Sequence, residues 1–338
     1  MLKNGSILVT GGAGFIGSAL IHGLNQRGLD DILVADFLGK DEKFKNLIPL
    51  RFDDYIEADK LLHTIEDHPQ YLNSIQTIFH LGACSSTTET DGRYLIQNNY
   101  TFTKTLAQWA ITNHKRFLYA SSAATYGDGA HSMDDKNNDL TRLRPLNLYA
   151  YTKQRFDLYA QRRGWLSNII GLKYFNIFGP NENHKGDMRS VVSKAFQQIH
   201  TQGKVNLFKS YHPQYADGEQ RRDFLYIKDA VAMTLHLAET PTAAGLYNLG
   251  AGHAHTWKEL VTPIFQALGN PVNITYIDMP QNLRSTYQYY TCADIAKLRD
   301  AGYKNTPTPL DEAIKEYVTH YLIPQKHLGD EQPTTHEP

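Results

Sequence analysis

The chain has 338 residues, of which 41% are hydrophobic, and its 34 Lys and Arg nearly balance 35 Asp and Glu. This length allows two domains, or one domain with a large insertion. A net charge of -1 argues against a nucleic-acid partner, because such proteins present clustered positive charge. No apolar run approaches the ~20 residues of a membrane span, and MLKNGS lacks a signal-peptide core. We therefore expect a cytoplasmic protein with no membrane partner.

Short apolar runs alternate with longer helical patterns along the first half of the chain. In order, they are residues 6–10 (SILVT), 15–28 (FIGSALIHGLNQRG), 31–36 (DILVAD), 75–83 (IQTIFHLGA), 116–122 (RFLYASS) and 168–179 (NIIGLKYFNIFG). Strands that are apolar almost throughout are typical of a parallel sheet covered on both faces. The pattern predicts an α/β fold with a Rossmann-like doubly wound sheet.

The second half reads differently, with polar loops that contain Gly and His between shorter elements. Such loops suit a smaller substrate-binding domain, interleaved in sequence with the first domain. The predicted division is a dinucleotide-binding domain at 1–175 with a return segment near 224–252, a substrate-binding domain at 176–223 and 253–323, and a disordered tail at 324–338.

The first chemical motif is VTGGAGFIG, in which Gly11, Gly14 and Gly17 follow a strand and open an amphipathic helix. These glycines permit a tight turn and close approach of the backbone to a pyrophosphate at the helix N-terminus. Asp36 ends the second strand, where an acid that binds the ribose is expected. The motif predicts a dinucleotide site.

The residues alone leave the choice of dinucleotide open. Asp36 favours NAD, because a carboxylate accepts a hydrogen bond from a ribose 2′-hydroxyl and repels a 2′-phosphate. Lys40, Lys43 and Lys45 follow closely and could neutralise that phosphate. A solvated charged loop is a nearly equal interpretation of these lysines.

Ser122, Tyr149 and Lys153 form the predicted catalytic group. Tyr149 and Lys153 are four residues apart, so they share one face of a helix that begins near Asn147. Ser122 ends a strand at the carboxyl edge of the sheet, where open α/β proteins bind ligands. A nearby lysine can lower the pKa of a tyrosine that acts as a base, and a serine can bind the reacting oxygen.

With these motifs in place, the chain resembles extended short-chain dehydrogenases/reductases and, more narrowly, the ADP-L-glycero-D-manno-heptose 6-epimerase family. The matching segments keep that family's order over roughly residues 5–322, and they are VTGGAGFIGS, GACSSTTETDG, NNY, FLYASSAATYG, PLNLYAYTK, YFNIFGPNENHKG, RRDFLYIKD and YNLGAG. The resemblance implies inversion of C6 of an ADP-heptose by transient oxidation and re-reduction, for the heptose of the lipopolysaccharide core. It also implies bound NADP, with NAD as the alternative, and a homo-oligomer, often a pentamer.

The resemblance also implies roles for individual residues. The dinucleotide would be lined by Phe15, Ile16, Asp36, Lys43, Ala83, Cys84, Ser85, Asn98, Lys153 and Ile177. Lys185 would join Ser122 and Tyr149 in the chemistry. The ADP-sugar would contact Ser85, Asn176, Phe208, Arg222 and Tyr287, with Asp187 and Lys194 in the same region.

Four positions depart from the family pattern. Phe37 follows Asp36 where a small amide is usual, and Ala58 replaces a second lysine for the 2′-phosphate, so both weaken the expectation of NADP. Asp187 and Lys194 leave the exact sugar nucleotide open. Cys84 and Cys292 are the two cysteines, for which we expect reduced packing roles and no metal site.

Related chemistries are distinguished by two alanines and one lysine. Nucleotide-sugar 4,6-dehydratases carry an Asp-Glu pair where this chain has Ala123 and Ala124, and alanine cannot move a proton. An exocyclic carbon that rotates during epimerisation needs a second proton donor, for which Lys185 is the candidate. A nucleotide-hexose 4-epimerase or reductase, or a dinucleotide-binding protein without turnover, remains as an alternative.

Overall fold

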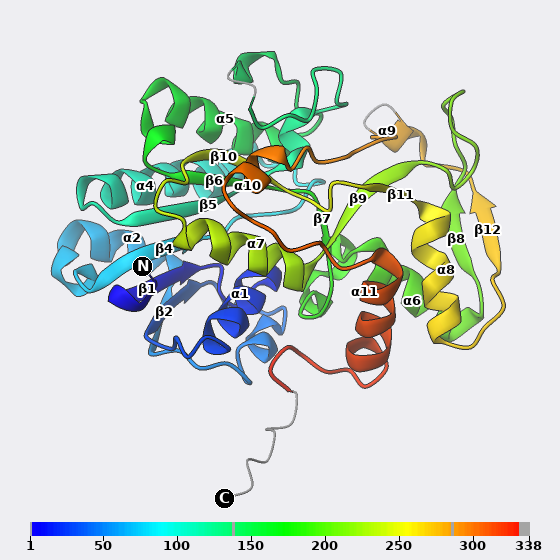
Figure 1. The fold of residues 1–338 in the computed structure, drawn as a ribbon, viewed down its shortest axis with the longest axis horizontal. Coiled ribbons are helices and arrows are strands. Elements are labelled where there is room, and N and C mark those ends of the chain that lie inside the picture. Colours follow the sequence, from blue (N-terminus) through cyan, green and yellow to red (C-terminus); the bar gives the residue numbers. More distant parts are fainter. Residues whose placement is uncertain (1, 137–138, 285–286, 331–338) are drawn as a thin grey trace, which may run out of the picture.

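The computed structural model describes residues 2–136, 139–284 and 287–330. At its centre seven parallel strands form one sheet (Figure 1). In spatial order the strands are β10 (Gly245–Leu249), β6 (Ile170–Tyr174), β5 (Arg116–Ser122), β4 (Ile75–His80), β1 (Ser6–Thr10), β2 (Ile32–Asp36) and β3 (Asp54–Glu57). The chain winds outward in both directions from β1, so the predicted doubly wound fold is confirmed.

Helices cover both faces of this sheet (Figure 1). One face carries α1 (Phe15–Asn25) and α7 (Ile227–Glu239), and the other carries α2 (Ala58–Asp67), α4 (Phe102–Thr112) and α5 (Leu148–Arg162). In β1, Ile7 and Val9 pack with α1 and α7, whereas Leu8 packs in the core on the opposite face. Successive strand residues point to opposite faces, and helices cover both faces, which explains why the central strands are apolar almost throughout.

Two smaller sheets lie beside the main one, on the right in Figure 1. The first contains β11 (Ala254–Thr256), β9 (Arg221–Tyr226) and β7 (Asn176–Phe178), and the second contains β12 (Ile274–Ile277) and β8 (Val205–Phe208). Near them α8 (Trp257–Ala267) contacts both α6 (Val191–Gln202) and α11 (Leu310–Glu316). The short helices are α3 (Gly92–Leu95), α9 (Gln281–Arg284) and α10 (Ala296–Asp300).

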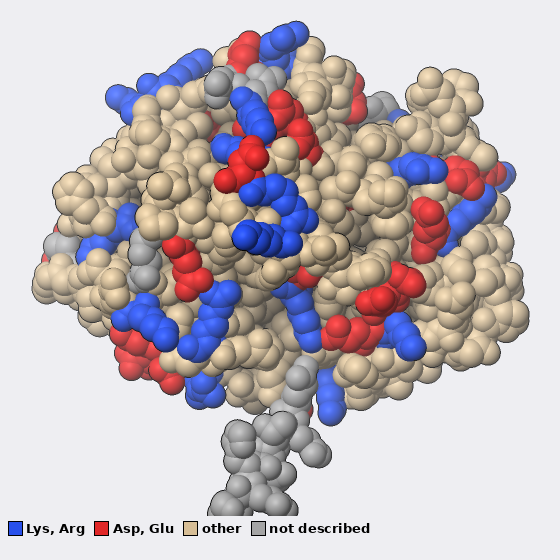
Figure 2. Space-filling model, viewed as in Figure 1, with Lys and Arg blue, Asp and Glu red and all other residues tan. Residues whose placement is uncertain are grey.

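The described chain also contains short segments of 3-10 or π geometry. The 3-10 segments are Leu2–Asn4, Lys43–Asn46, Pro69–Leu72, Ala123–Tyr126, Leu140–Arg142, Trp165–Ser167 and Asn183–Met188, and the π segments are Ile96–Thr101 and Tyr317–Leu322. No helix within the described ranges has both the length and the apolar character to cross a bilayer. Positive and negative side chains are interspersed on the face shown in Figure 2.

The later part of the chain contributes β10 to the main sheet, where it pairs in parallel with β6. The division into two interleaved domains stays a prediction. For the tail, the structure differs from the expected disorder over 324–330. Leu328 is buried there, and its N–H donates to Asn181 Oδ1 at 2.9 Å, because one leucine in this polar segment reaches the core. Residues 331–338 of the predicted tail lie outside the described residues.

A buried ion pair connects β5, β6 and α5. Lys173 Nζ of β6 lies 3.0 Å from Asp157 Oδ2 of α5, and both side chains are 1% exposed. The hydroxyls of Tyr119 and Ser121 on β5 each donate to the Asp157 carboxylate at 2.8 Å. Lys173 also donates to Thr125 Oγ1 at 2.6 Å, so both charges are hydrogen-bonded as well as paired.

Removing one charge of this pair should be costly. Asp157→Asn leaves the Lys173 ammonium buried without its counter-charge, and such changes typically cost about 3–5 kcal/mol of unfolding free energy. Urea denaturation should show a lower midpoint with an unchanged slope. As the control, Arg27→Ala breaks an exposed ion pair with Glu239 and should shift the midpoint little. Equal shifts of the midpoint in the two variants would show that the buried pair contributes no more to the free energy of unfolding than the exposed pair does.

Candidate active site

The glycine-rich turn between β1 and α1 is packed too tightly for side chains. Gly11 has φ +69°, and a Cβ there would lie 2.6 Å from Gly82 N, in the loop after β4. A Cβ on Gly17 would lie 2.1 Å from Gly11 O. The turn therefore needs glycine at both positions, and it presents the N-terminus of α1 to the space beyond the sheet.

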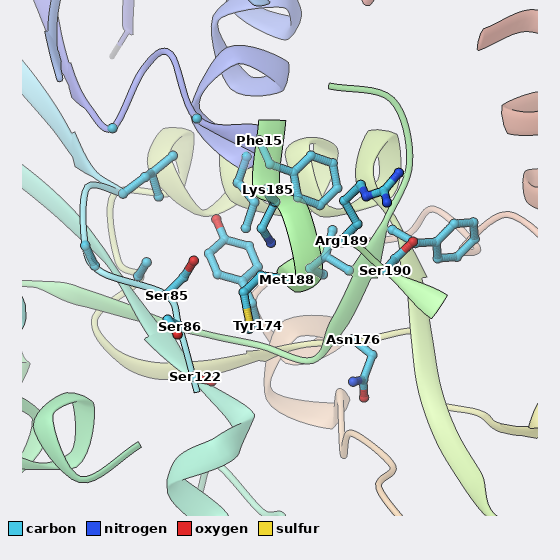
Figure 3. A pocket seen from close by; sticks show the side chains of 18 of the residues that line it. Phe15, Ser85, Ser86, Ser122, Tyr174, Asn176, Lys185, Met188, Arg189 and Ser190 are labelled. Carbon is cyan, nitrogen blue, oxygen red and sulfur yellow. The ribbon is translucent and has the colours of Figure 1, made fainter. Parts of the chain in front are cut away.

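A cavity of about 670 Å³ opens at the carboxyl ends of β1, β4, β5 and β6 (Figure 3). The predicted residues that line it are Gly11, Gly14, Phe15, Ile16, Gly17, Asp36, Lys43, Ala83, Cys84, Ser85, Ser122, Tyr149, Lys153, Asn176, Ile177 and Lys185. Its volume is in the range of small-molecule and cofactor pockets. The glycine cradle and the helix N-terminus fit a dinucleotide pyrophosphate.

One corner of the cavity is formed by Asp36 and Lys43. Lys43 Nζ donates to Asp36 Oδ1 at 2.9 Å, and both side chains are largely buried. The Asp36 carboxylate also accepts from the backbone N–H of Ala13 at 2.9 Å and of Phe37 at 2.7 Å. Asp41 lines the same cavity. The carboxylate that the sequence assigns to a ribose is thus already held by three donors.

Ser122, Tyr149 and Lys153 meet where β5 approaches the first turns of α5. Asn147 caps this helix, since its Oδ1 accepts from Ala150 N at 2.8 Å, and the cap sets where Tyr149 and Lys153 fall. Ser122 Oγ accepts from Ala124 N at 3.1 Å, and both Ser122 and Tyr149 line the cavity. Lys153 Nζ donates to Ala120 O of β5 at 2.9 Å.

The pKa shifts in this group differ in one respect from the sequence argument. Burial raises the pKa of Tyr149, and the nearby Ser122 hydroxyl acts in the opposite direction. Burial lowers the pKa of Lys153 to about 8, although the negative charge of Asp157 acts to raise it. Ser122 is therefore the neighbour that favours the ionised tyrosine in this structure, while the Lys153 ammonium is directed to a backbone carbonyl.

Lys185 approaches the cavity from a separate wall, the 3-10 segment Asn183–Met188 (Figure 3). Its Nζ lies 5.3 Å from the centre of the Phe15 ring, a cation–π contact. Burial lowers the pKa of Lys185, and the charge of Glu182 raises it. A partly desolvated lysine on a cavity wall is suited to exchange protons with a bound ligand.

Two predicted substrate residues lie behind the cavity wall. Arg222 is 6% exposed, and its guanidinium lies 5.2 Å from the Tyr287 ring and 5.8 Å from the Trp257 ring. Tyr287 Oη accepts from Trp257 Nε1 at 2.9 Å, and Trp257 itself lines the cavity. Arg222 and Tyr287 therefore do not line the cavity themselves, and each contacts Trp257, which does.

Four other predicted residues are not among those that line the cavity, namely Asn98, Asp187, Lys194 and Phe208. Asn98 Nδ2 donates to Tyr94 O in its own helix. Its neighbour Asn99 is the one that holds the cavity loop, since Asn99 Oδ1 accepts from Cys84 N at 2.9 Å and Nδ2 donates to Cys84 O at 3.0 Å. Contacts of the four residues with a ligand stay predictions.

Sequence reasoning missed several residues that line the cavity, among them Asp41, Ser86, His184, Met188, Arg189, Ser190 and Trp257. Most were detectable, because they adjoin the quoted GACSS and NHKG segments. Arg189 is held by its own surroundings, with Nε donating to Gly186 O and Nη2 to Gln197 Oε1, each at 3.0 Å. Among the described residues no cluster of three or more His, Cys, Asp or Glu is arranged to hold a metal ion.

Comparison with known proteins gives consistent matches. Residues 7–250 match the model of the NAD dependent epimerase/dehydratase family. ADP-L-glycero-D-manno-heptose-6-epimerase of Nitratidesulfovibrio vulgaris is 47% identical over 315 residues, which cover 93% of this chain and 97% of that protein. The chain belongs to the NAD dependent epimerase/dehydratase family.

Two further relatives in this family extend the match. The enzyme of the same name from Fusobacterium nucleatum is 40% identical over 94% of this chain and 98% of its own length. The crystal structure of the Helicobacter pylori ADP-L-glycero-D-manno-heptose-6-epimerase superposes with a TM-score of 0.77 at 29% identity, covering 94% of this chain and 96% of that one. Ala123 and Ala124 begin the turn after β5, and neither side chain can transfer a proton there.

Proposed function

We propose that the protein inverts C6 of ADP-D-glycero-D-manno-heptose to give the L-glycero epimer, for the heptose of the lipopolysaccharide core. The observation that carries this proposal is that Tyr149 on α5 and Lys185 on the segment Asn183–Met188 line the same cavity from two different parts of the chain. The full-length relatives at 40% and 47% identity carry this activity in their names. The cytoplasmic location and the homo-oligomer stay predictions.

Two walls matter because of the geometry of an exocyclic carbon. If C6 turns about its bond to the ring, its oxygen moves from one position to another while the sugar stays bound. A single acid/base group cannot contact both positions, so Tyr149 would exchange a proton with the oxygen in one and Lys185 in the other. Ser122 would hydrogen-bond the oxygen beside Tyr149. When bound, the dinucleotide supplies a hydride acceptor that returns the hydride to the same carbon.

The substrate would be held on the side of the smaller sheets. Asn176 and Ser85 line the cavity directly, and Arg222 with Tyr287 would support the wall at Trp257. We assign Arg222 to the diphosphate, because a guanidinium matches phosphate oxygens. Lys194, Asp187 and Phe208 are proposed for the same region on the resemblance alone.

We propose NADP as the dinucleotide, with NAD as the alternative. The Asp36 carboxylate is already bound by Lys43 and by two backbone N–H groups. Because Lys43 compensates its negative charge, the carboxylate would repel a 2′-phosphate less strongly. Lys43 would contact that phosphate as well. Asp41 adds a second carboxylate to the corner and, together with Phe37 and Ala58, favours NAD.

The direct test of the activity is incubation of the purified protein with ADP-D-glycero-D-manno-heptose and chromatographic separation of the C6 epimers. We expect conversion to a mixture of the two epimers without net consumption of NADPH or NADH. Turnover of a nucleotide-hexose at C4 instead, or net reduction of the sugar, would identify the alternative enzyme classes. Absence of turnover on both sugars with dinucleotide bound would indicate a binding protein.

Tightly held dinucleotide is the second expectation, because a cofactor that left mid-cycle would strand a ketone. Denaturing the protein and analysing the supernatant should give a dinucleotide, mainly NADP. Gly17→Ala should release far less, since the new methyl would lie 2.1 Å from Gly11 O, whereas the control Gly92→Ala places it 3.6 Å from Leu148. Release of NAD alone would overturn the assignment of Lys43 to a 2′-phosphate.

The two-wall mechanism predicts an asymmetry between variants. Tyr149→Phe and Lys185→Met should each abolish epimerisation, and they should differ in which epimer they still oxidise. Removing a positioned acid/base typically costs about 10² to 10⁴ in rate, so single-turnover reduction of the bound dinucleotide, followed by absorbance with each epimer separately, should resolve the difference. A Lys185→Met protein that epimerises at nearly the wild-type rate would favour one tyrosine and rotation of the whole sugar.

A further inference from the structure

Glu182 is a fully buried carboxylate immediately before the segment that carries Lys185. Its Oε1 accepts from Gly179 N at 3.3 Å and from Ser190 Oγ at 2.7 Å, and its Oε2 accepts from Ser190 N. Tyr317 Oη, from the C-terminal π segment, also donates to Oε1 at 3.1 Å. Every one of these bonds uses the carboxylate as an acceptor, which is the role of its ionised form.

These contacts close the Lys185 segment into a loop. Gly179 precedes it and Ser190 follows it, so one carboxylate binds the backbone at both ends. The residues between them that line the cavity are His184, Lys185, Met188 and Arg189. Because Tyr317 lies in the far C-terminal part of the chain, the loop is also fixed to the body of the protein.

The same carboxylate interacts electrostatically with the catalytic candidate in the loop. Burial raises the pKa of Glu182, while the donors from Ser190 and the charge of Lys185 lower it. In return, the charge of Glu182 raises the pKa of Lys185 against the effect of burial. The two groups therefore favour each other's charged form.

We propose that Glu182 is the positioning residue for Lys185, which it serves by fixing both ends of the 183–189 loop and by holding a negative charge near the ammonium. The proposal rests on the proposed function, in that it assigns Lys185 to one of two oxygen positions. Tyr149 is mounted on α5 and does not depend on this loop. Glu182 should therefore matter for one half of the reaction only.

Glu182→Gln tests this asymmetry. Its amide keeps the shape but loses the charge, and its NH₂ group would oppose one of the donors of Ser190 or Gly179. We expect single-turnover reduction of the bound dinucleotide to fall at least about tenfold with the epimer that Lys185 serves, and to change less than about threefold with the epimer that Tyr149 serves. Lys185→Met identifies which epimer is which.

A pH profile separates charge from shape. Because the charge of Glu182 raises the pKa of Lys185, Glu182→Gln should move the limb of the profile that belongs to Lys185 to lower pH, and the limb of Tyr149 should stay. Glu182→Asp keeps the charge but shortens the side chain, so it should slow the same epimer without moving that limb. Tyr317→Phe removes one donor and keeps the charge, and it should change both rates less than about threefold.

The outcomes are distinguishable. Equal slowing with both epimers in Glu182→Gln and in Glu182→Asp, without a shifted limb, would show a structural role only and overturn the proposal. The melting curve and dinucleotide content show whether Glu182→Gln folds. If it does not fold, equal slowing of the reaction with both epimers in Glu182→Asp is sufficient to overturn the proposal. The wild-type protein is assayed first, and its failure to epimerise ADP-heptose would refute the proposed function rather than the role of Glu182.

Discussion

The buried ion pair between Asp157 and Lys173 sets the register of α5 against the strands that end at the cavity. Tyr149, Lys153 and Asp157 are spaced by four residues, so they lie along one face of the helix. Asp157 also accepts from Ser121, the residue before Ser122. A buried charge pair in which both partners are also hydrogen-bonded tolerates little displacement, so we expect it to hold the neighbouring Ser122 and Tyr149 in place.

The segment that carries Lys185 has its own support. The Lys185 loop is tied through Glu182 to Tyr317, and Asn181 connects it further, with Nδ2 donating to Ser18 Oγ in α1 at 3.0 Å. If Tyr149 and Lys185 are the two proton-transfer groups, as we propose, their separate supports would direct them at two oxygen positions without moving the rest of the site. This separation is what an exocyclic carbon requires and a single catalytic helix cannot provide.

Much of this arrangement was predictable from the sequence. Gly11 and Gly17 follow a strand and open a helix. The structure shows why glycine is needed there, because a Cβ at either position would clash with the backbone. The four-residue spacing of Tyr149 and Lys153 likewise predicted that they share one face of a helix, and both lie on α5. Such motifs are local, so neighbouring residues determine the geometry without knowledge of the packing.

The remainder depended on packing between distant segments. The π segment Ile96–Thr101 brings Asn99, rather than Asn98, to the Cys84 loop, because one extra residue per turn changes which side chain faces inward. Trp257 stands between Arg222 and the cavity, which no motif indicates. The link from Glu182 to Tyr317 joins residues 135 positions apart, and no local pattern marks it.

The central claim is that a hydride leaves C6 and returns to the opposite face of the same carbon. The most direct measurement is the fate of deuterium placed at C6 of the D-glycero substrate, followed by mass spectrometry and NMR of the L-glycero product in ordinary water. The account predicts full retention of the label at C6, with no transfer to added dinucleotide and no solvent hydrogen at that carbon. Loss of the label to water would show that a proton, not a hydride, is removed, and would contradict the account.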